Sequence, residues 1–268
     1  MSSKKSQFNK ILQDIKSIKI QGASNIAKAG FRAYQLFPTS SAKKKLIAVR
    51  PTEPMLEKVL NLSEKQSEKQ ILEHFKQAQE KINKQVLTII KNNDIIFTHC
   101  HSTNVVNSLI YAKKKGKNFQ VYNTETRPLF QGRKTAKELS RAKIKVTHFT
   151  DNAIAEALNS VDKVFLGADA LTEKGIINKI GSELIARIAK ENKIPVYIIA
   201  DSWKFTKKPV PIEQRSLNEV WNIASKNIKI RNPAFEFVPK KYLTKIISEL
   251  GILSYDRFLR IVNKQNIF

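Results

Sequence analysis

The sequence predicts an α/β protein, with an N-terminal helical domain over residues 1–92 and a Rossmann-like domain over residues 93–268. Two observations predict this division. Apolar residues recur at helical spacing before residue 93, whereas short apolar runs alternate with helical segments after it. Such alternation is typical of a doubly wound parallel sheet. The chain of 268 residues is long enough for one or two domains with a buried core.

The chain begins with two predicted helices. In the first, over residues 5–19, Lys alternates with Ile and Leu at helical spacing, and Gly22 breaks the pattern. The second runs from Ala23 to Phe37, and Pro38 closes it because proline cannot continue a helix.

A loop and two further helices complete the first part of the chain. Lys43, Lys44 and Lys45 lie in a Ser/Thr-rich stretch that predicts a solvated loop, and Pro51 and Pro54 punctuate the short helix that follows. The longest predicted helix covers residues 63–91, with Ser63 as its N-cap. Its apolar side chains recur at spacings of three and four and predict a buried stripe: Ile71, Phe75, Ala78, Ile82, Val86 and Ile89.

Five short apolar runs after residue 93 predict the strands of the sheet. They cover residues 94–98, 118–122, 144–149, 162–166 and 195–200. Helical segments separate them at residues 103–115, 134–142, 151–159 and 181–192. Sheets of this kind bind ligands at the carboxyl ends of their strands, so the residues that follow each strand are the candidates for function.

Composition narrows the functional classes. The formal net charge of +25 would attract nucleic acid, anionic membranes or phosphorylated small molecules. However, 38 lysines and ten arginines carry it, no RNA-recognition motif accompanies it, and most lysines are expected to form a solvated surface. The lone cysteine excludes an intramolecular disulfide, and neither a bilayer-spanning apolar run nor a signal peptide is present. We therefore expect a cytoplasmic protein without a membrane or nucleic-acid partner.

Cys100 follows the first predicted strand and lies between His99 and His101. A buried structural cysteine is one interpretation of this residue. The other is a reactive thiol, because a helix N-terminus predicted just beyond it would lower the thiol pKa. A metal site is disfavoured, because on extended backbone the two histidines point away from the cysteine, and no second cysteine exists.

Asp169 lies in a Gly-Ala-Asp-Ala segment after the fourth predicted strand. It is either a turn residue bonded to its own backbone or an acid that acts together with Cys100 across a bound sugar. Lys179, in the segment 175–181, and Lys204, after the fifth predicted strand, could hold phosphate, as could the helix that Gly181 opens. The glycine-rich patterns of dinucleotide and P-loop sites are absent from the sequence.

Four segments resemble the initiation factor 2B alpha/beta/delta family. They are THCHS (98–102), NTETRPLFQGRKTAKEL (123–139), VDKVFLGADALTEKGIINKIGS (161–182) and NPAFEFVP (232–239). The resemblance extends over most of the chain, and the family includes isomerases of methylthioribose 1-phosphate and ribose 1,5-bisphosphate. Within it, THCHS and the Arg50-Pro51-Thr52 motif are most similar to the archaeal ribose-1,5-bisphosphate isomerases.

The resemblance implies an aldose–ketose isomerase that acts in AMP salvage, with Cys100 as base and Asp169 as acid. It implies no metal or redox cofactor, AMP as an activator, a phosphorylated sugar as substrate, and a homo-oligomer that is a dimer or a hexamer. The substrate-binding residues that it implies are Gln21, Gly22, Ala23, Ser24, Arg50, Ser102, Thr103, Asn104, Asn178, Lys179 and Lys204.

Two departures from the isomerase pattern leave alternatives open. Gln21 and Thr103 stand where the isomerases commonly carry a cation, and the region between Gly22 and Cys100 is shorter than in those enzymes. A methylthioribose-1-phosphate isomerase would need fewer cations, because its substrate carries one phosphate. A non-catalytic regulatory subunit of the translation-factor branch is the other alternative, although the regulatory subunits commonly lack the cysteine.

Overall fold

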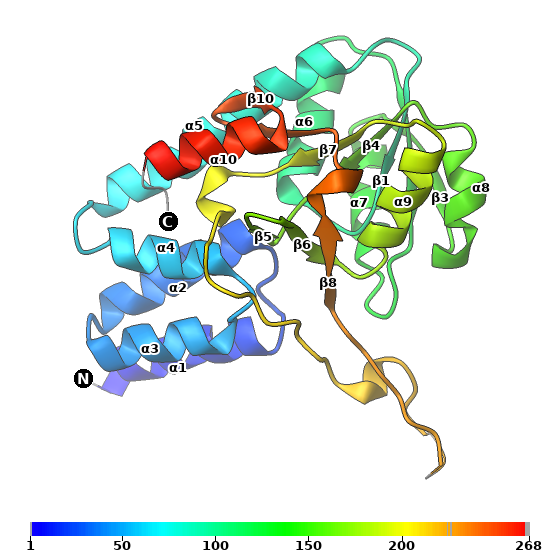
Figure 1. Cartoon of the computed structure of the whole chain (residues 1–268). Helices are drawn as coiled ribbons and strands as arrows, with labels where there is room; N and C mark the ends of the chain where they lie inside the picture. Colours follow the sequence, from blue (N-terminus) through cyan, green and yellow to red (C-terminus); the bar gives the residue numbers. More distant parts are fainter. Residues whose placement is uncertain (1, 224, 226, 266–268) are drawn as a thin grey trace.

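The computed structural model describes residues 2–223, 225 and 227–265, and its first part is helical (Figure 1). The helices before the sheet are α1 (Ser2–Lys16), α2 (Ala23–Leu36), α3 (Ser40–Val49), α4 (Pro54–Leu62) and α5 (Glu68–Ile89). They bury a core of their own, to which Ile15, Ile26, Leu46 and Leu60 belong. The predicted helical character of this part is confirmed.

Two local predictions in this part are wrong. Lys43, Lys44 and Lys45 lie within α3 rather than in a loop, because the helix buries Ala42 and Leu46 between the lysines and the neighbouring helices. Tertiary burial thus outweighs the loop-like local composition.

The start of α5 also differs from the prediction. Ser63 caps the C-terminal end of α4, while Ser67 caps α5. Ser67 and Gln70 form a capping box in which each side chain accepts a backbone N–H of the other. The residue type at the cap was predicted correctly, but its position lies four residues further along the chain.

A seven-stranded sheet forms the second part of the molecule, in the order β10-β9-β7-β4-β1-β2-β3. All neighbours pair in parallel except β9 and β10. The strands are β1 (Ile95–Thr98), β2 (Gln120–Thr124), β3 (Lys145–Phe149), β4 (Lys163–Leu166), β7 (Val196–Ile199), β9 (Lys245–Ser248) and β10 (Gly251–Leu253). The five predicted strands are confirmed, and the β9–β10 hairpin adds two that were not predicted.

Helices cover both faces of this sheet, as a doubly wound fold requires. They are α5 of the first part together with α6 (Thr103–Lys114), α7 (Gln131–Arg141), α8 (Ile154–Leu158), α9 (Ser182–Glu191) and α10 (Tyr255–Lys264). Neighbouring residues of β1 face opposite sides: Ile96 packs in the core with α5 and α6, and Phe97 packs in the core with α8, α9 and α10. The predicted fold class is therefore confirmed.

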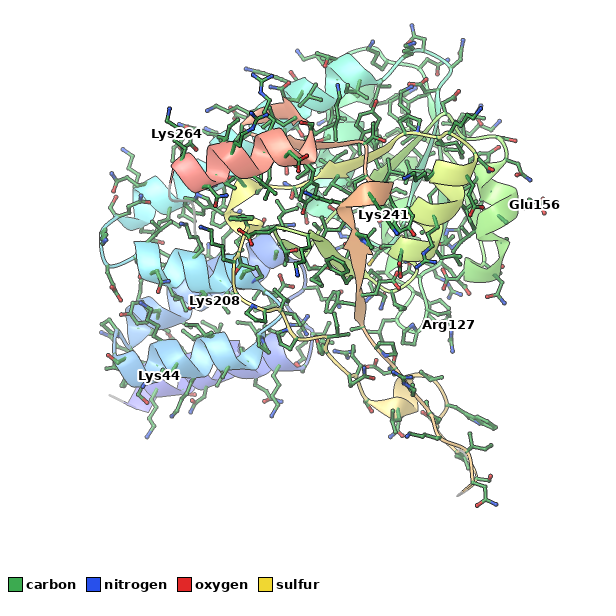
Figure 2. The ribbon with its side chains drawn as sticks, in the orientation of Figure 1. Lys44, Arg127, Glu156, Lys208, Lys241 and Lys264 are labelled. Carbon is green, nitrogen blue, oxygen red and sulfur yellow. The ribbon has the colours of Figure 1, made fainter. Side chains whose placement is uncertain are left out.

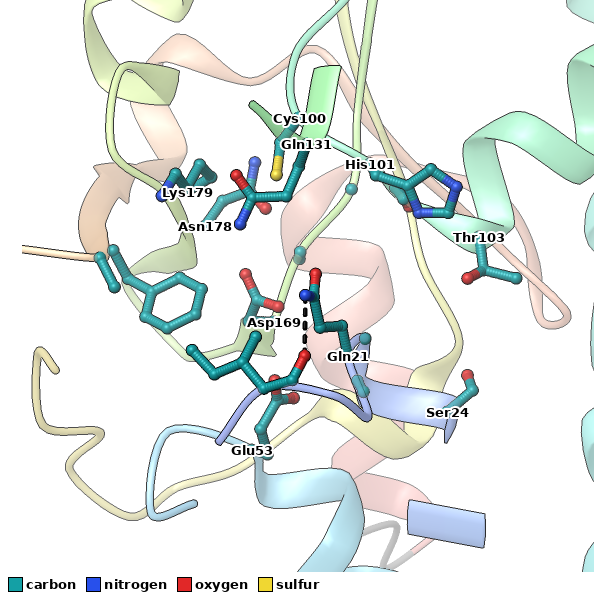
Figure 3. A pocket seen from close by; sticks show the side chains of 18 of the residues that line it. Gln21, Ser24, Glu53, Cys100, His101, Thr103, Gln131, Asp169, Asn178 and Lys179 are labelled. Atoms are coloured by element: carbon teal, nitrogen blue, oxygen red, sulfur yellow. Dashed lines mark hydrogen bonds between the residues drawn. The ribbon is translucent and has the colours of Figure 1, made fainter. Parts of the chain in front are cut away.

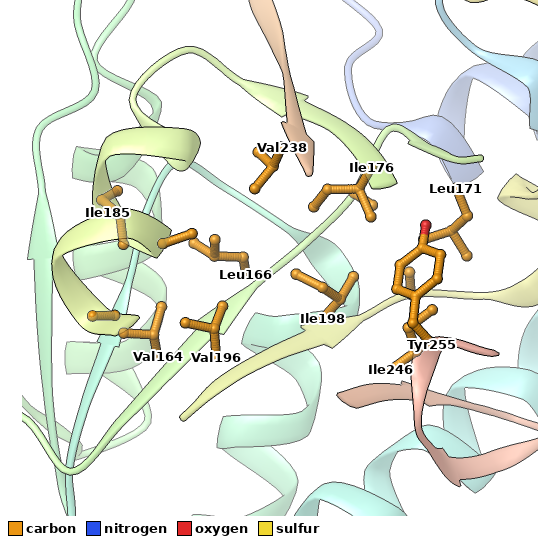
Figure 4. Packing of buried hydrophobic residues seen from close by; sticks show 14 of the residues in the cluster. Val164, Leu166, Leu171, Ile176, Ile185, Val196, Ile198, Val238, Ile246 and Tyr255 are labelled. Atoms are coloured by element: carbon orange, nitrogen blue, oxygen red, sulfur yellow. The ribbon is translucent and has the colours of Figure 1, made fainter. Parts of the chain in front are cut away.

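A second, antiparallel sheet was not predicted. It consists of β5 (Ala170–Leu171), β6 (Gly175–Lys179) and β8 (Phe235–Pro239). Leu171, Ile176 and Val238 pack in the same core as Leu166 and Ile198 of the large sheet (Figure 4). This packing fixes β5 and β6, so the residues at their ends are held relative to the carboxyl ends of β1 and β4.

The short 3-10 helix η2 (Ser202–Lys204) is held by the helical part of the molecule. The ring of Trp203 stacks on that of His74 from α5, with centroids 3.4 Å apart, and packs in the core of the first helices. The Nε2 atom of His74 also lies 3.1 Å from both carboxylate oxygens of Asp201. The backbone after β7 is therefore clamped to α5.

The chain then leaves the body of the molecule as an extended arm between η2 and β8 (Figure 1). The remaining short helices are η1 (Asp151–Ala153), η3 (Leu217–Glu219) and η4 (Lys240–Tyr242).

Exposed lysines occur on separate parts of the surface, for example Lys44, Lys208, Lys241 and Lys264 (Figure 2). Across the described residues, no helix combines the length and hydropathy that crossing a bilayer requires.

Candidate active site

One cavity opens at the carboxyl ends of the strands, and all thirteen residues predicted for the site line it. Its upper part in Figure 3 contains Cys100, Lys179 and Asn178, with Asp169 at the centre. Gln21, Ser24 and Glu53 come from the helical part and close the cavity from below. The site is therefore built between the two parts of the chain.

Cys100 is held by its backbone in the left-handed region, with φ of 63°. Its N–H donates to Thr126 Oγ1 at 3.0 Å, and its carbonyl accepts from Thr135 Oγ1 at 2.8 Å. Such strain in a non-glycine residue persists only where the surroundings fix it, and it turns the partly buried thiol into the cavity.

The expectation of a lowered thiol pKa is wrong for this site. Burial raises the pKa of Cys100 to about 11, and the Lys179 ammonium and the His101 amide offset this only in part. Cys100 is not part of the helix N-terminus, because α6 begins at Thr103 and its N-cap is Ser102. Cys100 is therefore a neutral thiol at neutral pH.

The two histidines beside Cys100 make contacts elsewhere. His99 Nε2 donates to the Ile180 carbonyl at 2.8 Å, and its Nδ1 lies 2.6 Å from the Thr124 hydroxyl. Burial lowers the pKa of His99 to about 4, so the ring is neutral. His101 Nε2 instead lies 3.1 Å from Glu138 Oε2 on α7. The histidines position the backbone around the thiol rather than pairing with it.

Asp169 follows β4, and its N–H donates to the Ile177 carbonyl at 2.9 Å. Burial raises the pKa of its carboxyl, while the nearby charges of Lys204, Arg50 and Lys179 lower it. Because desolvation is the largest of these effects, the pKa of Asp169 lies above that of an exposed aspartate, and its protonated form is more populated. This direction is the one that a proton donor requires.

Three predicted cations line the cavity and are almost fully buried. Lys179 and Lys204 are 4% and 6% exposed, and Lys204 Nζ donates to the Ala168 carbonyl at 2.6 Å. Arg50 Nη1 forms an ion pair with Glu213 at 3.2 Å. Buried cations are costly without anionic partners, so a cavity lined by them suits an anionic ligand.

Helix N-termini differ in what they offer to an anion. Gly22 is the N-cap of α2 without a side-chain cap, and Gly22, Ala23 and Ser24 line the cavity. The first N–H groups of α2 therefore supply an anion site. The corresponding expectation for α9 is wrong, because the Glu236 carboxylate already accepts from the Glu183 N–H at 2.8 Å.

Other predicted residues of the cavity are engaged in hydrogen bonds that shape its wall. Gln21 Nε2 donates to the Ile18 carbonyl at 2.8 Å, and Asn178 Nδ2 donates to Ser182 Oγ at 2.8 Å. Asn104 Nδ2 donates to Gln79 Oε1 at 2.9 Å. Ser102 lies so close to Gly167 that a Cβ there would come within 2.6 Å of the serine Oγ. Thr103 lines the cavity at the start of α6.

Sequence reasoning missed several residues of the cavity, and the most buried acid among them is Glu53. It directly follows the Arg50-Pro51-Thr52 motif, so extending that motif by one residue would have found it. Glu213 and Arg215 come from the arm, and Gln131 comes from α7. No local signal marks Glu213 and Arg215, because the arm reaches the cavity only through the tertiary fold, whereas Gln131 lies within the family segment 123–139.

Fold and site together define an α/β protein with a cation-lined cavity for an anionic small molecule, equipped with a thiol and a buried carboxyl group. The chain belongs to the Initiation factor 2 subunit family, which matches residues 16–255.

Relatives of known structure or name fall into different branches of this family. The ribose 1,5-bisphosphate isomerase of Methanocaldococcus jannaschii is 34% identical, over 90% of this chain and 89% of its own length. The translation initiation factor eIF-2B of Pyrococcus horikoshii matches with a TM-score of 0.81 and 27% identity, covering 92% of this chain and 96% of that one. The 5-methylthioribose 1-phosphate isomerase of the same organism matches with a TM-score of 0.78 and 26% identity, covering 97% and 88%.

Proposed function

We propose that this protein is a sugar-phosphate isomerase that converts ribose 1,5-bisphosphate to ribulose 1,5-bisphosphate in AMP salvage. The observation that carries the proposal is that Cys100 and Asp169 line one cavity together with buried cations. The similarity to the Methanocaldococcus jannaschii isomerase over most of both chains supports the choice of substrate.

Phosphate binding is assigned to groups that the cavity brings together. Lys179, Lys204 and Arg50 supply positive charge, and the uncapped N-terminus of α2 at Gly22 supplies free N–H groups. Two phosphates of one sugar would meet cations at the strand ends and amides at the helical wall.

The reaction uses Asp169 as the acid and the thiolate form of Cys100 as the base. The phosphate on C1 of the sugar prevents opening to a free aldehyde, so the ring must open directly. Asp169 donates its proton to the ring oxygen as the bond between C1 and the ring oxygen breaks, and the Cys100 thiolate removes the proton from C2. The resulting phosphoenol is protonated at C1 by Cys100. The C2 hydroxyl loses its proton as the ketone forms, and this proton restores Asp169.

The thiol pKa sets a requirement on this sequence of steps. A thiol of pKa about 11 is thiolate in only about one part in 10⁴ at pH 7. The charge of Lys179 lowers that pKa, so Lys179 is the group that stabilises the thiolate during turnover.

The test is incubation with ribose 1,5-bisphosphate, with and without AMP, and detection of ribulose 1,5-bisphosphate. Turnover is expected, with AMP as an activator. The Cys100→Ser and Asp169→Asn variants are expected to lose it while keeping the circular dichroism spectrum of the folded protein. A folded protein that turns over neither ribose 1,5-bisphosphate nor methylthioribose 1-phosphate would refute the proposal and favour a non-catalytic regulatory role.

Assembly as a dimer or hexamer belongs to the same proposal and is tested by analytical ultracentrifugation. The proposal also places the protein in the cytoplasm.

One observation favours a second substrate. Gln21 and Thr103 are neutral residues of the cavity wall, and the side chains of Ile18, Leu129 and Phe235 line the same cavity. A cavity with fewer cations and some apolar wall suits methylthioribose 1-phosphate, which has one phosphate and an apolar methylthio group. Measuring kcat/KM for both sugars side by side decides between the two substrates.

A further inference from the structure

Glu53 occupies the floor of the cavity, below Asp169 in Figure 3. It is the N-cap residue of α4, but its side chain makes no capping hydrogen bond. The residue is only 3% exposed, and its Oε2 atom is buried without a hydrogen-bond partner among the described residues. An unpartnered buried carboxyl oxygen is costly, so its retention in a cavity wall points to a partner supplied by a ligand.

The charged and titratable groups that act on Glu53 come from several parts of the fold. They are Asp169 after β4, Arg50 before α4, Lys204 of η2 and Glu213 of the arm. Arg50 is already paired with Glu213, and Lys204 donates to the Ala168 carbonyl. Burial and the charge of Asp169 raise the pKa of Glu53 to about 8, against the lowering effects of Arg50 and Lys204. Two carboxyl groups in one dry site do not both ionise readily, so Glu53 is mostly protonated at pH 7.

We propose that Glu53 is a substrate-binding residue that acts in its neutral form, donating a hydrogen bond from its carboxyl group to an oxygen of the bound sugar phosphate. This inference rests on the proposed function and adds a residue to it. A neutral acid both donates and accepts, as a sugar hydroxyl does, and does not repel phosphate. An ionised Glu53 would place a negative charge beside an anionic ligand and beside Asp169. Substrate binding should therefore weaken as Glu53 loses its proton.

The experiment measures KM and kcat for ribose 1,5-bisphosphate between pH 7 and 9 in the wild type, Glu53→Gln and Glu53→Leu. In the wild type, KM is expected to rise about tenfold over this range, because a group of pKa 8 is about one-tenth protonated at pH 9. Glu53→Gln keeps a neutral hydrogen-bond donor, so its KM should change less than twofold between pH 7 and 9. Glu53→Leu removes the donor and should raise KM about tenfold at pH 7, with a smaller change in kcat.

Glu57→Gln is the matched control, because Glu57 lies one turn further along α4 and pairs with Lys208 at the surface. It should reproduce the wild-type pH profile. A KM that rises in parallel in the wild type and Glu53→Gln would overturn the inference, and so would a Glu53→Leu variant with unchanged KM. The ionisation of the substrate affects both proteins alike and cannot produce a difference between them.

Calorimetric binding of the same sugar in the same pH series separates this inference from the proposed function. Turnover with identical pH profiles of KM in the wild type and Glu53→Gln leaves the function standing and overturns the role of Glu53. Binding without turnover, weakening with pH in the wild type alone, refutes the function and supports the role of Glu53. A folded protein that binds no ribose 1,5-bisphosphate at pH 7 refutes both.

Discussion

Alkylation of Cys100 by iodoacetamide should be slow at neutral pH and should accelerate strongly in alkali. The chain has one cysteine, so the rate of mass increase of the intact protein reports on this thiol alone. The perturbation is a pH series from 7 to 10, in the absence of sugar phosphate. Only the thiolate reacts with iodoacetamide, and burial of Cys100 disfavours that charged form.

The expected alkylation rate follows from the thiol pKa, which is about 11 in place of the ordinary value of 9. This difference makes the thiolate population at pH 7 about 100-fold smaller than in an exposed thiol, which corresponds to about 3 kcal/mol in the free energy of ionisation. The alkylation rate should therefore be about 100-fold below that of an exposed reference thiol. It should then rise about tenfold with each pH unit up to pH 10.

Lys179 provides the internal check on this interpretation, because its charge lowers the pKa of Cys100. Lys179→Met should slow alkylation further at pH 8. Lys174 is the control, because it is exposed directly before β6, and Lys174→Met should leave the rate unchanged. A rate at pH 7 within threefold of the reference thiol would refute the reasoning. A rate independent of pH would also refute it, since it would mean that access rather than ionisation limits the reaction.

Two further predictions concern stability, and both are measured by chemical denaturation. Gly132→Ala should destabilise the fold by about 3 kcal/mol or more, because a Cβ at this position would lie 1.7 Å from the Thr124 carbonyl oxygen; a loss below 1 kcal/mol would contradict that contact. Phe97→Ala should lower the free energy of unfolding by about 3–5 kcal/mol, since Phe97 is fully buried in the core between the large sheet and its covering helices. A loss below about 1.5 kcal/mol would show that the core collapses into the space left by the phenyl ring.

The central strands and most helices were predictable because each forms a periodic or apolar segment long enough to recognise. The small sheet was not, because β5 has only two residues and β8 pairs with β6 from more than fifty residues away in the sequence. The helix α3 was missed for a different reason. Its stability comes from burial of Ala42 and Leu46 against other helices, and local composition does not record that contact.

For the site, the sequence placed thirteen residues that do line one cavity, because strand ends and the family motifs mark them. It could not supply the electrostatic state of the thiol. The pKa of Cys100 depends on how much water the assembled cavity excludes, and its neighbours in sequence suggest the opposite direction. Glu53 was missed for a similar reason, since an acid after a proline-containing motif becomes unusual only once the fold buries it beside Asp169.

The division of the cavity between two stretches of the chain has a consequence for how such proteins diversify. Cys100 and Asp169 lie on loops of the sheet, whereas Gln21, Arg50 and Glu53 lie among the helices before β1. Substitutions in the helical stretch can thus change the ligand-facing wall while Cys100 and Asp169 stay in place. Under the proposed function, loss of the thiol alone would leave a cavity that still binds the phosphorylated sugar. A catalyst and a metabolite sensor would then differ by few mutations, which fits a family whose members carry both isomerase and translation-factor names.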